Sequence, residues 1–165
     1  EEKERQEKLI VKRVKTILTS TPANAFFIIE NAGTRKIGQT LDELARIIYE
    51  VDQKRVRVCL DTCHLHAAGY DICGKEKLEA FLKEFDKKIG LERLECFHIN
   101  DSRDPFASLR DRHQNIGEGE VGKEVFRGLL NHPKTKHLPF IIETPGFDDQ
   151  GPDKANLDIL KAMVQ

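Results

Sequence analysis

Seven carboxylate and imidazole side chains stand at or just after the ends of four short apolar runs in this sequence. They are Glu30, Asp61, His64, His98, Asp111, His113 and Glu143. If the four runs are parallel strands of one barrel, their carboxyl ends open on the face where enzymes of that architecture build their sites. Without a cation, groups converging there would repel one another or lack partners. Mixed imidazole and carboxylate ligands suit zinc, with manganese or iron as alternatives, so the pattern predicts a metal site.

Each of these positions also has an ordinary structural interpretation. A carboxylate at a strand end usually caps a helix or forms a salt bridge, and the spacing of Asp61 and His64 occurs by chance in many loops. The coincidence of all seven at equivalent places favours a metal site over seven unrelated explanations. Cys63, which lies between Asp61 and His64, is expected to be a structural thiol because the sequence shows no neighbour that would activate it.

Strand and helix patterns alternate along the elements that must position these groups. Runs rich in β-branched and aromatic residues, with the length of buried parallel strands, cover residues 25–30, 56–61, 94–100 and 139–143. Apolar stripes with helical spacing lie within residues 9–18, 41–51, 78–85, 125–130 and 157–163. Thr40 is expected to cap the second helix, Glu43 to complete a capping box, and Gly90 to end the third helix.

The order of these elements calls for a parallel sheet with helical crossovers, either an open doubly wound sheet or part of a barrel. No glycine-rich phosphate motif follows the first strand, which weakens the nucleotide-binding open sheet. A complete (β/α)8 barrel usually needs about 250 residues, whereas this chain has 165 residues and shows four strands. We therefore expect an α/β fold in which residues 1–165 form a single partial TIM-barrel domain of about four β/α units. The amino-terminal half of the barrel is expected to be missing.

Composition limits the class of protein without selecting an activity. The chain is 39% hydrophobic and 33% charged, and no apolar run is long enough to cross a membrane. The four cysteines have neither zinc-knuckle nor disulfide-framework spacing, so an intracellular setting is expected, cytoplasmic in a prokaryote or nuclear or mitochondrial in a eukaryote. The net charge of −1 gives no global sign of nucleic-acid binding. A DNA substrate would therefore require local basic side chains and bound metal.

Five motifs resemble the endonuclease IV family (AP endonuclease family 2) of zinc-dependent DNA-repair nucleases. They are IIENAG (28–33), DTCHLHAAGYD (61–71), FHIND (97–101), DRHQNIGEGEVG (111–122) and IIETPG (141–146), in family order across most of the chain. The resemblance implies the carboxy-terminal part of a xylose-isomerase-like (β/α)8 barrel. Such a barrel holds three metal ions, typically zinc, above its carboxyl face.

The resemblance also implies how the expected ligands are shared among the three metals. Glu30 resembles the carboxylate that bridges the first and second metals. The other ligands of the second metal resemble Asp61, His98 and Glu143, and the ligand set of the third resembles His64, Asp111 and His113. The first metal also needs two histidines from the amino-terminal half, which nothing in this chain matches.

The implied reaction is hydrolysis of the phosphodiester 5′ to an abasic site in double-stranded DNA, leaving a 3′-hydroxyl. A metal pair would lower the pKa of water, with Glu30 bridging the metals and Glu143 placed to orient or deprotonate that water. Arg112, which lies between two expected ligands, is placed for a phosphate, and a salt bridge is an equal expectation for it. Further contacts to the DNA backbone are expected from Arg35, Lys36, Arg103 and Arg110.

Two other functions stay open. Sugar isomerases or epimerases with xylose-isomerase-like barrels also place Glu, Asp, His and Glu at strand ends, around one divalent metal. They have no need for Asp111 and His113, so the extra pair favours the nuclease. The second alternative is a truncated domain that binds metal or DNA without turnover.

Overall fold

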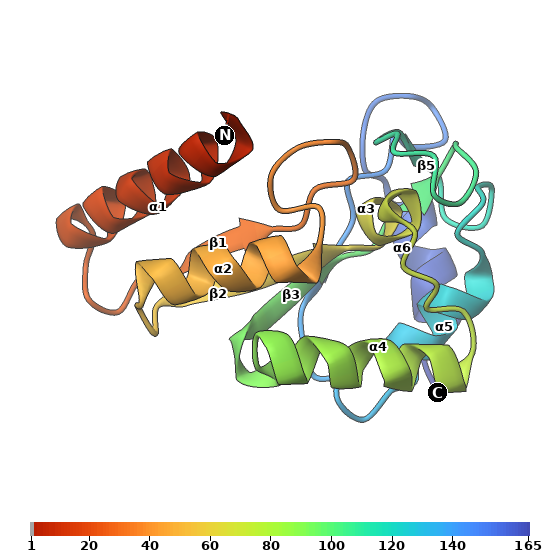
Figure 1. Cartoon of the computed structure of the whole chain (residues 1–165). Coiled ribbons are helices and arrows are strands. Elements are labelled where there is room, and N and C mark those ends of the chain that lie inside the picture. Colours follow the sequence, from red (N-terminus) through yellow and green to blue (C-terminus); the bar gives the residue numbers. More distant parts are fainter. Residues whose placement is uncertain (1) are drawn as a thin grey trace.

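The computed structural model describes residues 2–165, and its centre is a parallel sheet of four strands. In spatial order the strands are β1 (Phe27–Glu30), β2 (Val56–Asp61), β3 (Leu94–His98) and β6 (Phe140–Ile141). Each neighbouring pair is parallel, and Asp61 lies opposite His98 in the register. The predicted parallel sheet with helical crossovers is therefore confirmed (Figure 1).

Helices connect the strands and contact one another in succession, α1 with α2, α2 with α4 and α4 with α5. This succession is typical of the outer layer of a β/α barrel. The bounds are α1 (Glu2–Ser20), α2 (Leu41–Val51), α3 (Thr62–Ala68), α4 (Lys75–Lys88), the 3-10 helix η1 (Leu91–Arg93), α5 (Lys123–Asn131) and α6 (Lys154–Lys161). A small antiparallel ribbon pairs β4 (Asp101–Ser102) with β5 (His113–Gln114).

Two predicted bounds differ from the structure for identifiable reasons. The first helix begins at Glu2 rather than near Leu9, because ion pairs one turn apart, such as Lys8 with Glu4, support its charged opening. The last strand spans two residues instead of five. The backbone N–H of Glu143 donates to the side-chain oxygen of Asn100 at 2.7 Å instead of continuing the ladder.

The predicted cap of α2 is present, but its partner residue acts differently. The Thr40 hydroxyl accepts a hydrogen bond from the Glu43 N–H at 3.2 Å, as expected. The Glu43 carboxylate accepts from the N–H groups of Gly38 and Gln39 at 3.0 Å each, so it organises the preceding loop rather than closing a capping box. Gly90 follows α4 with φ of 100°, a left-handed conformation that suits glycine at a helix end.

The core lies between the sheet and the helices, whereas the other face of the sheet is partly open. Leu60 and Phe97 of the sheet and Phe85 of α4 are fully buried in one apolar cluster. Ile28 and Ile141, on the two edge strands, remain 45% and 46% exposed. Within residues 2–165, β1 and β6 each pair on one side only, so the sheet is open at both edges.

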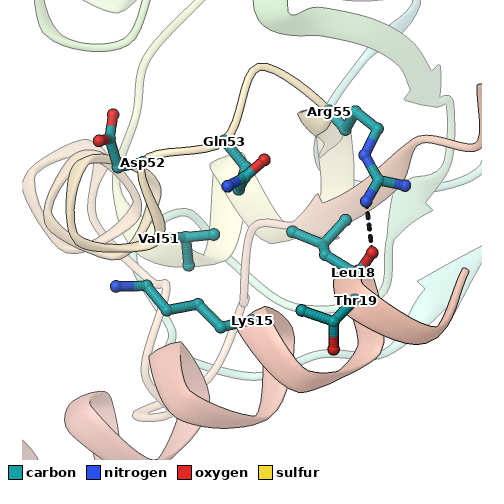
Figure 2. A pocket seen from close by; sticks show the side chains of 7 residues that line it. All are labelled: Lys15, Leu18, Thr19, Val51, Asp52, Gln53 and Arg55. Carbon is teal, nitrogen blue, oxygen red and sulfur yellow. Dashed lines mark hydrogen bonds between the residues drawn. The ribbon is translucent and has the colours of Figure 1, made fainter. Parts of the chain in front are cut away.

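The end of the sheet at which β2 begins is tied to α1 by Arg55 (Figure 2). Its guanidinium donates to the carbonyl of Leu18, and to the carbonyl of Pro22 at 2.8 Å, which satisfies carbonyls at and just after the end of α1. The pocket drawn in Figure 2 is lined by Arg55, Gln53 and Lys15 among others. It lies away from the carboxyl ends of the strands. No helix among residues 2–165 is long and apolar enough to span a membrane.

Candidate metal centre

The carboxyl ends of the strands bring four of the predicted ligands together. Glu30, Asp61, His98 and Glu143 each offer one ligand atom, and these atoms lie within 4.8 Å of one another. The Nδ1 atom of His98 lies 3.2 Å from Glu30 Oε1, 3.1 Å from Glu143 Oε2 and 4.0 Å from Asp61 Oδ2. This group is the set that the resemblance to endonuclease IV implies for the second metal.

A second group of potential ligands lies beside the first and shares Asp61 with it. Asp61, His64 and His113 offer atoms within 4.8 Å of one another. Asp111 joins them, because its Oδ1 lies 3.0 Å from His64 Nε2 and 3.5 Å from His113 Nε2. The structure thus brings together His64, Asp111 and His113, the set that the resemblance implies for the third metal.

The hydrogen bonds of the two imidazoles leave the same nitrogen of each ring facing Asp111. His64 Nδ1 lies 2.8 Å from the carbonyl oxygen of Asn31, and His113 Nδ1 lies 3.1 Å from that of Glu143. Since a carbonyl only accepts, Nδ1 of each ring carries a hydrogen, and Nε2 is the atom left to bind a cation. Among residues 2–165, the buried Nε2 atom of His113 has no hydrogen-bond partner, as expected of a metal ligand.

Charges within the centre shift the pKa values of its members. Burial opposes ionisation of Glu30, yet hydrogen bonds from His64 and His98 lower its pKa to about 2. Burial also disfavours the charged form of His64, but its hydrogen bond to Glu30 and the charges of Asp61 and Asp111 raise its pKa to about 9. Desolvation raises the pKa of the buried Asp61. Carboxylates outnumber imidazoles by four to three, and such a donor set fits divalent cations.

The helix α3 places His64 above the end of β2. Asp61 ends the strand and caps the helix, because its Oδ1 accepts from the His64 N–H at 3.0 Å. The loop after β1 packs closely against His64. A Cβ atom added at Gly33 would lie 2.8 Å from His64 Cδ2, so this position requires glycine. The sequence predicted neither this short helix nor the close approach of the loop.

The ribbon β4–β5 places His113, and the buried carboxylate of Asp101 organises it. Asp101 accepts hydrogen bonds from the N–H groups of Gly117 at 2.8 Å, Gly119 at 3.2 Å and Val121 at 2.9 Å. The Gly-Glu-Gly segment therefore wraps around a carboxylate and shapes a turn. Sequence reasoning missed Asn31, Asn100 and Asp101. Their signal was a polar residue directly after an apolar strand run, and all three are buried.

Cys63 lies close to the second group without the character of a ligand. Its Sγ atom and one ligand atom each of Asp111 and His113 lie within 4.8 Å of one another, close enough to share a cation. Burial, however, raises the pKa of this thiol to about 12, which disfavours the thiolate that a metal would need. We therefore exclude Cys63 from the second group, whose potential ligands are Asp61, His64, Asp111 and His113. The structural role predicted for Cys63 fits its complete burial.

The basic residues predicted to contact DNA lie in the loops around the centre. Arg112 forms the salt bridge that was its alternative role, because its Nε lies 2.7 Å from Asp104 Oδ2. Its side chain remains 57% exposed, and Arg110 lies 3.5 Å from the same carboxylate. The other three, Arg35, Lys36 and Arg103, are exposed. Contact of any of these side chains with DNA stays a prediction.

The arrangement of strands, helices and potential ligands agrees with a protein family whose model matches this sequence. A family model described as "Xylose isomerase-like TIM barrel" matches residues 1–163. The chain belongs to this family. The predicted fold class, the carboxy-terminal part of a barrel of this kind, is therefore confirmed.

Relatives within this family carry the name that the motifs suggested. A protein from Chloroflexus aggregans (strain MD-66 / DSM 9485), named "Probable endonuclease 4", is 45% identical over 130 residues, covering 78% of this chain and 46% of its own length. One of the same name from Persephonella marina (strain DSM 14350 / EX-H1) is 40% identical over 161 residues, covering 96% and 56%.

A solved structure gives the same result in three dimensions. The crystal structure of endonuclease IV from Thermus thermophilus matches with a TM-score of 0.75 at 33% sequence identity, over 93% of this chain and 57% of that chain. The resemblance to endonuclease IV is thus confirmed. The chain spans about half the length of the curated relatives that it matches.

Proposed function

We propose that this chain forms the carboxy-terminal half of a DNA-repair nuclease of the endonuclease IV type. The reaction is hydrolysis of the phosphodiester 5′ to an abasic site in double-stranded DNA, leaving a 3′-hydroxyl. One observation carries the proposal: four carboxylates and three imidazoles converge in two adjoining groups, and the buried Nε2 of His113 has no hydrogen-bond partner in the described part of the chain. The names of the relatives support the same reaction class.

Zinc is the cation that we propose for both groups, with manganese or iron as alternatives. One ion would be held by Glu30, Asp61, His98 and Glu143, and another by His64, Asp111 and His113. Glu30 would also reach toward a third ion, whose remaining ligands would come from outside this chain. When bound, such cations lower the pKa of water and supply positive charge for the phosphate oxygens.

The residues of the chain contribute binding, orientation and proton transfer. Glu143 is exposed on the face of the centre while its Oε2 lies 3.1 Å from His98 Nδ1, so it is placed to accept a proton from an attacking water. Glu30 carries a full negative charge near neutral pH, because hydrogen bonds from His64 and His98 hold its pKa at about 2 despite its partial desolvation. Arg112 would contact a phosphate of the DNA backbone while Asp104 fixes the direction of its guanidinium.

A sugar isomerase remains the second candidate, and the Asp111–His113 pair argues against it. A single-metal isomerase would use Glu30, Asp61, His98 and Glu143 alone. It would leave the imidazole of His113 buried without a partner for its Nε2. A second cation would give that nitrogen a ligand role. Hydrolysis of a phosphodiester also has two oxygens to stabilise, that of the attacking water and that of the leaving alcohol.

A chimaeric barrel tests the reaction. This chain would replace the matching 161-residue segment of the Persephonella marina relative, and the purified protein would be offered a duplex with one abasic site and, separately, a ketose. We expect cleavage 5′ to the abasic site and no isomerisation. The same chimaera with Glu143→Gln should lose cleavage while keeping its thermal transition. Isomerisation of the ketose without strand cleavage would overturn the proposal.

Metal analysis tests the two groups in the chain itself. The purified 165-residue protein would be titrated with zinc and the bound metal counted by atomic emission. Two ions per chain are expected, because each group lies wholly within residues 30–143. A single ion would favour the isomerase. No bound metal would contradict both enzymes.

A further inference from the structure

Asn100 lies beneath the centre, and its side chain spans the gap between two of the ligands. It is completely buried, two residues after the end of β3. We infer that Asn100 is a positioning residue that fixes Asp61 and Glu143 for cation binding. This inference rests on the proposed metal centre. Asn100 touches neither a substrate nor a cation and acts through those two ligands.

The backbone of Asn100 is held rigidly by the first residue of α3. The hydroxyl of Thr62 donates to the Asn100 carbonyl at 2.6 Å and accepts from the Asn100 N–H at 2.9 Å. Thr62 is also buried, so water does not compete for these bonds. The residue after Asp61 therefore fixes the position of Asn100, which ties the end of β2 to the segment after β3.

The amide of Asn100 bonds one ligand with each of its two ends. Its Nδ2 donates to Asp61 Oδ2 at 2.6 Å, and its Oδ1 accepts from the Glu143 N–H at 2.7 Å. These partners decide the orientation of the amide, because a carboxylate only accepts and a backbone N–H only donates. Asparagine presents this donor and this acceptor at every pH, whereas an aspartate of the same size could make both bonds only as the neutral acid.

These bonds leave Asp61 a single orientation. Its Oδ1 is occupied by the N–H of His64 at 3.0 Å and its Oδ2 by Asn100. The remaining electron pairs of Oδ2 face His113 Nε2 at 3.6 Å and His98 Nδ1 at 4.0 Å, one imidazole from each ligand group. Asn100 thereby orients the Asp61 carboxylate, which the two groups share. Through its bond to the Glu143 N–H it also fixes the backbone position of Glu143.

The substitution Asn100→Asp separates the two bonds at constant size. An aspartate keeps an acceptor for the Glu143 N–H but places an oxygen 2.6 Å from Asp61 Oδ2, where the donor stood. The purified chain would be titrated with Co²⁺, whose visible absorption reports ligand geometry, and its affinity measured by competition with a chelator. We expect affinity to fall by about 10- to 100-fold, the usual effect of removing a hydrogen-bond partner of a metal ligand. The absorption spectrum should change as well.

Asn156→Asp is the matched control. Asn156 is equally buried, and its amide also makes two-ended bonds, accepting from the Ile116 N–H at 2.8 Å and donating to Asn115 Oδ1 at 2.9 Å. It bonds none of the seven ligands. We expect this variant to lose thermal stability while its Co²⁺ affinity and spectrum match those of the unchanged chain.

The outcomes distinguish failure of the role inferred for Asn100 from failure of the proposed metal centre. Equal Co²⁺ affinity and an identical spectrum in Asn100→Asp and the unchanged chain would overturn the role of Asn100 and leave the metal centre standing. Failure of the unchanged chain to bind Co²⁺ would overturn both. If Asn100→Asp gives no cooperative thermal transition, Asn100→Ser replaces it. That neutral variant loses both bonds without adding charge, and the same loss of affinity is expected.

Discussion

At the scale of single residues, His113 distinguishes a two-group centre from a one-metal site. Its Nδ1 faces the carbonyl of Glu143, and its buried Nε2 has no hydrogen-bond partner among the described residues. Replacement by alanine would therefore remove a proposed ligand while costing one backbone contact. We predict that His113→Ala binds one zinc ion fewer per chain. Cleavage by the chimaeric barrel should fall by about 100-fold or more, the size of effect seen when one transition-state-stabilising group is removed. Atomic emission and a gel assay measure the two quantities.

His137→Ala provides the comparison, because His137 is exposed in the loop before β6 and belongs to neither group of potential ligands. It should change neither the metal count nor the cleavage rate. Full cleavage by His113→Ala would remove the assignment of the third metal, whatever the metal count.

Arg112 makes a second prediction at this scale. Its guanidinium is exposed although it is paired with Asp104, so it can contact a phosphate without unfolding any segment. We expect Arg112→Ala to weaken binding of the chimaeric barrel to an abasic-site duplex. The slope of log affinity against log salt should fall by about 0.9, the loss of one phosphate contact. Arg127→Ala, an exposed arginine of α5, should leave the slope unchanged. Equal slopes for the unchanged chimaera, Arg112→Ala and Arg127→Ala would show that Arg112 contacts no phosphate and has only a structural role.

At the scale of elements, apolar patterns predicted the sheet and five helices, and with them that Glu30, Asp61, His98 and Glu143 would come together at the carboxyl ends of the strands. Strand ends are predictable because a polar residue after a buried run marks where the chain reaches the sheet edge. The helix α3 and the ribbon β4–β5 were not predictable, because they are too short to show a period. The bonds of Asn31 and Asn100 join residues 30 to 43 positions apart, and local sequence carries no signal for them.

The ribbon yields the prediction at this scale. A Cβ atom at Gly119 would lie 2.4 Å from the carbonyl oxygen of Ser102 and 2.5 Å from Asp101 Oδ1, both fixed by hydrogen bonds. Gly119→Ala should therefore lower the free energy of unfolding by about 1–3 kcal/mol, as overpacking does. Gly128→Ala meets only Leu78 Cδ2 at 3.4 Å within α5, where alanine favours the helix, so stability should stay equal or rise. Urea denaturation compares the two. An unchanged midpoint for Gly119→Ala would contradict the tight turn around Asp101.

At the scale of the whole molecule, the open face of the sheet governs how the chain behaves in solution. The edge strands β1 and β6 present unpaired backbone groups on one side each, and Ile28 and Ile141 extend apolar surface between them. In a closed eight-stranded barrel both features would be covered. Exposed sheet edges and apolar faces promote association between chains.

We therefore predict that the 165-residue chain self-associates in a concentration-dependent manner and cleaves abasic-site DNA far more slowly than the chimaeric barrel. The double variant Ile28→Thr, Ile141→Thr should shift the sedimentation profile toward monomer, because it reduces the apolar area without altering the buried cluster of Leu60 and Phe97. The zinc count should stay the same, since neither isoleucine is a ligand. Sedimentation velocity over a range of concentrations measures the first effect and atomic emission the second. A monomeric unchanged chain that cleaves at the rate of the chimaera would show that the two ligand groups suffice and that the open face needs no partner.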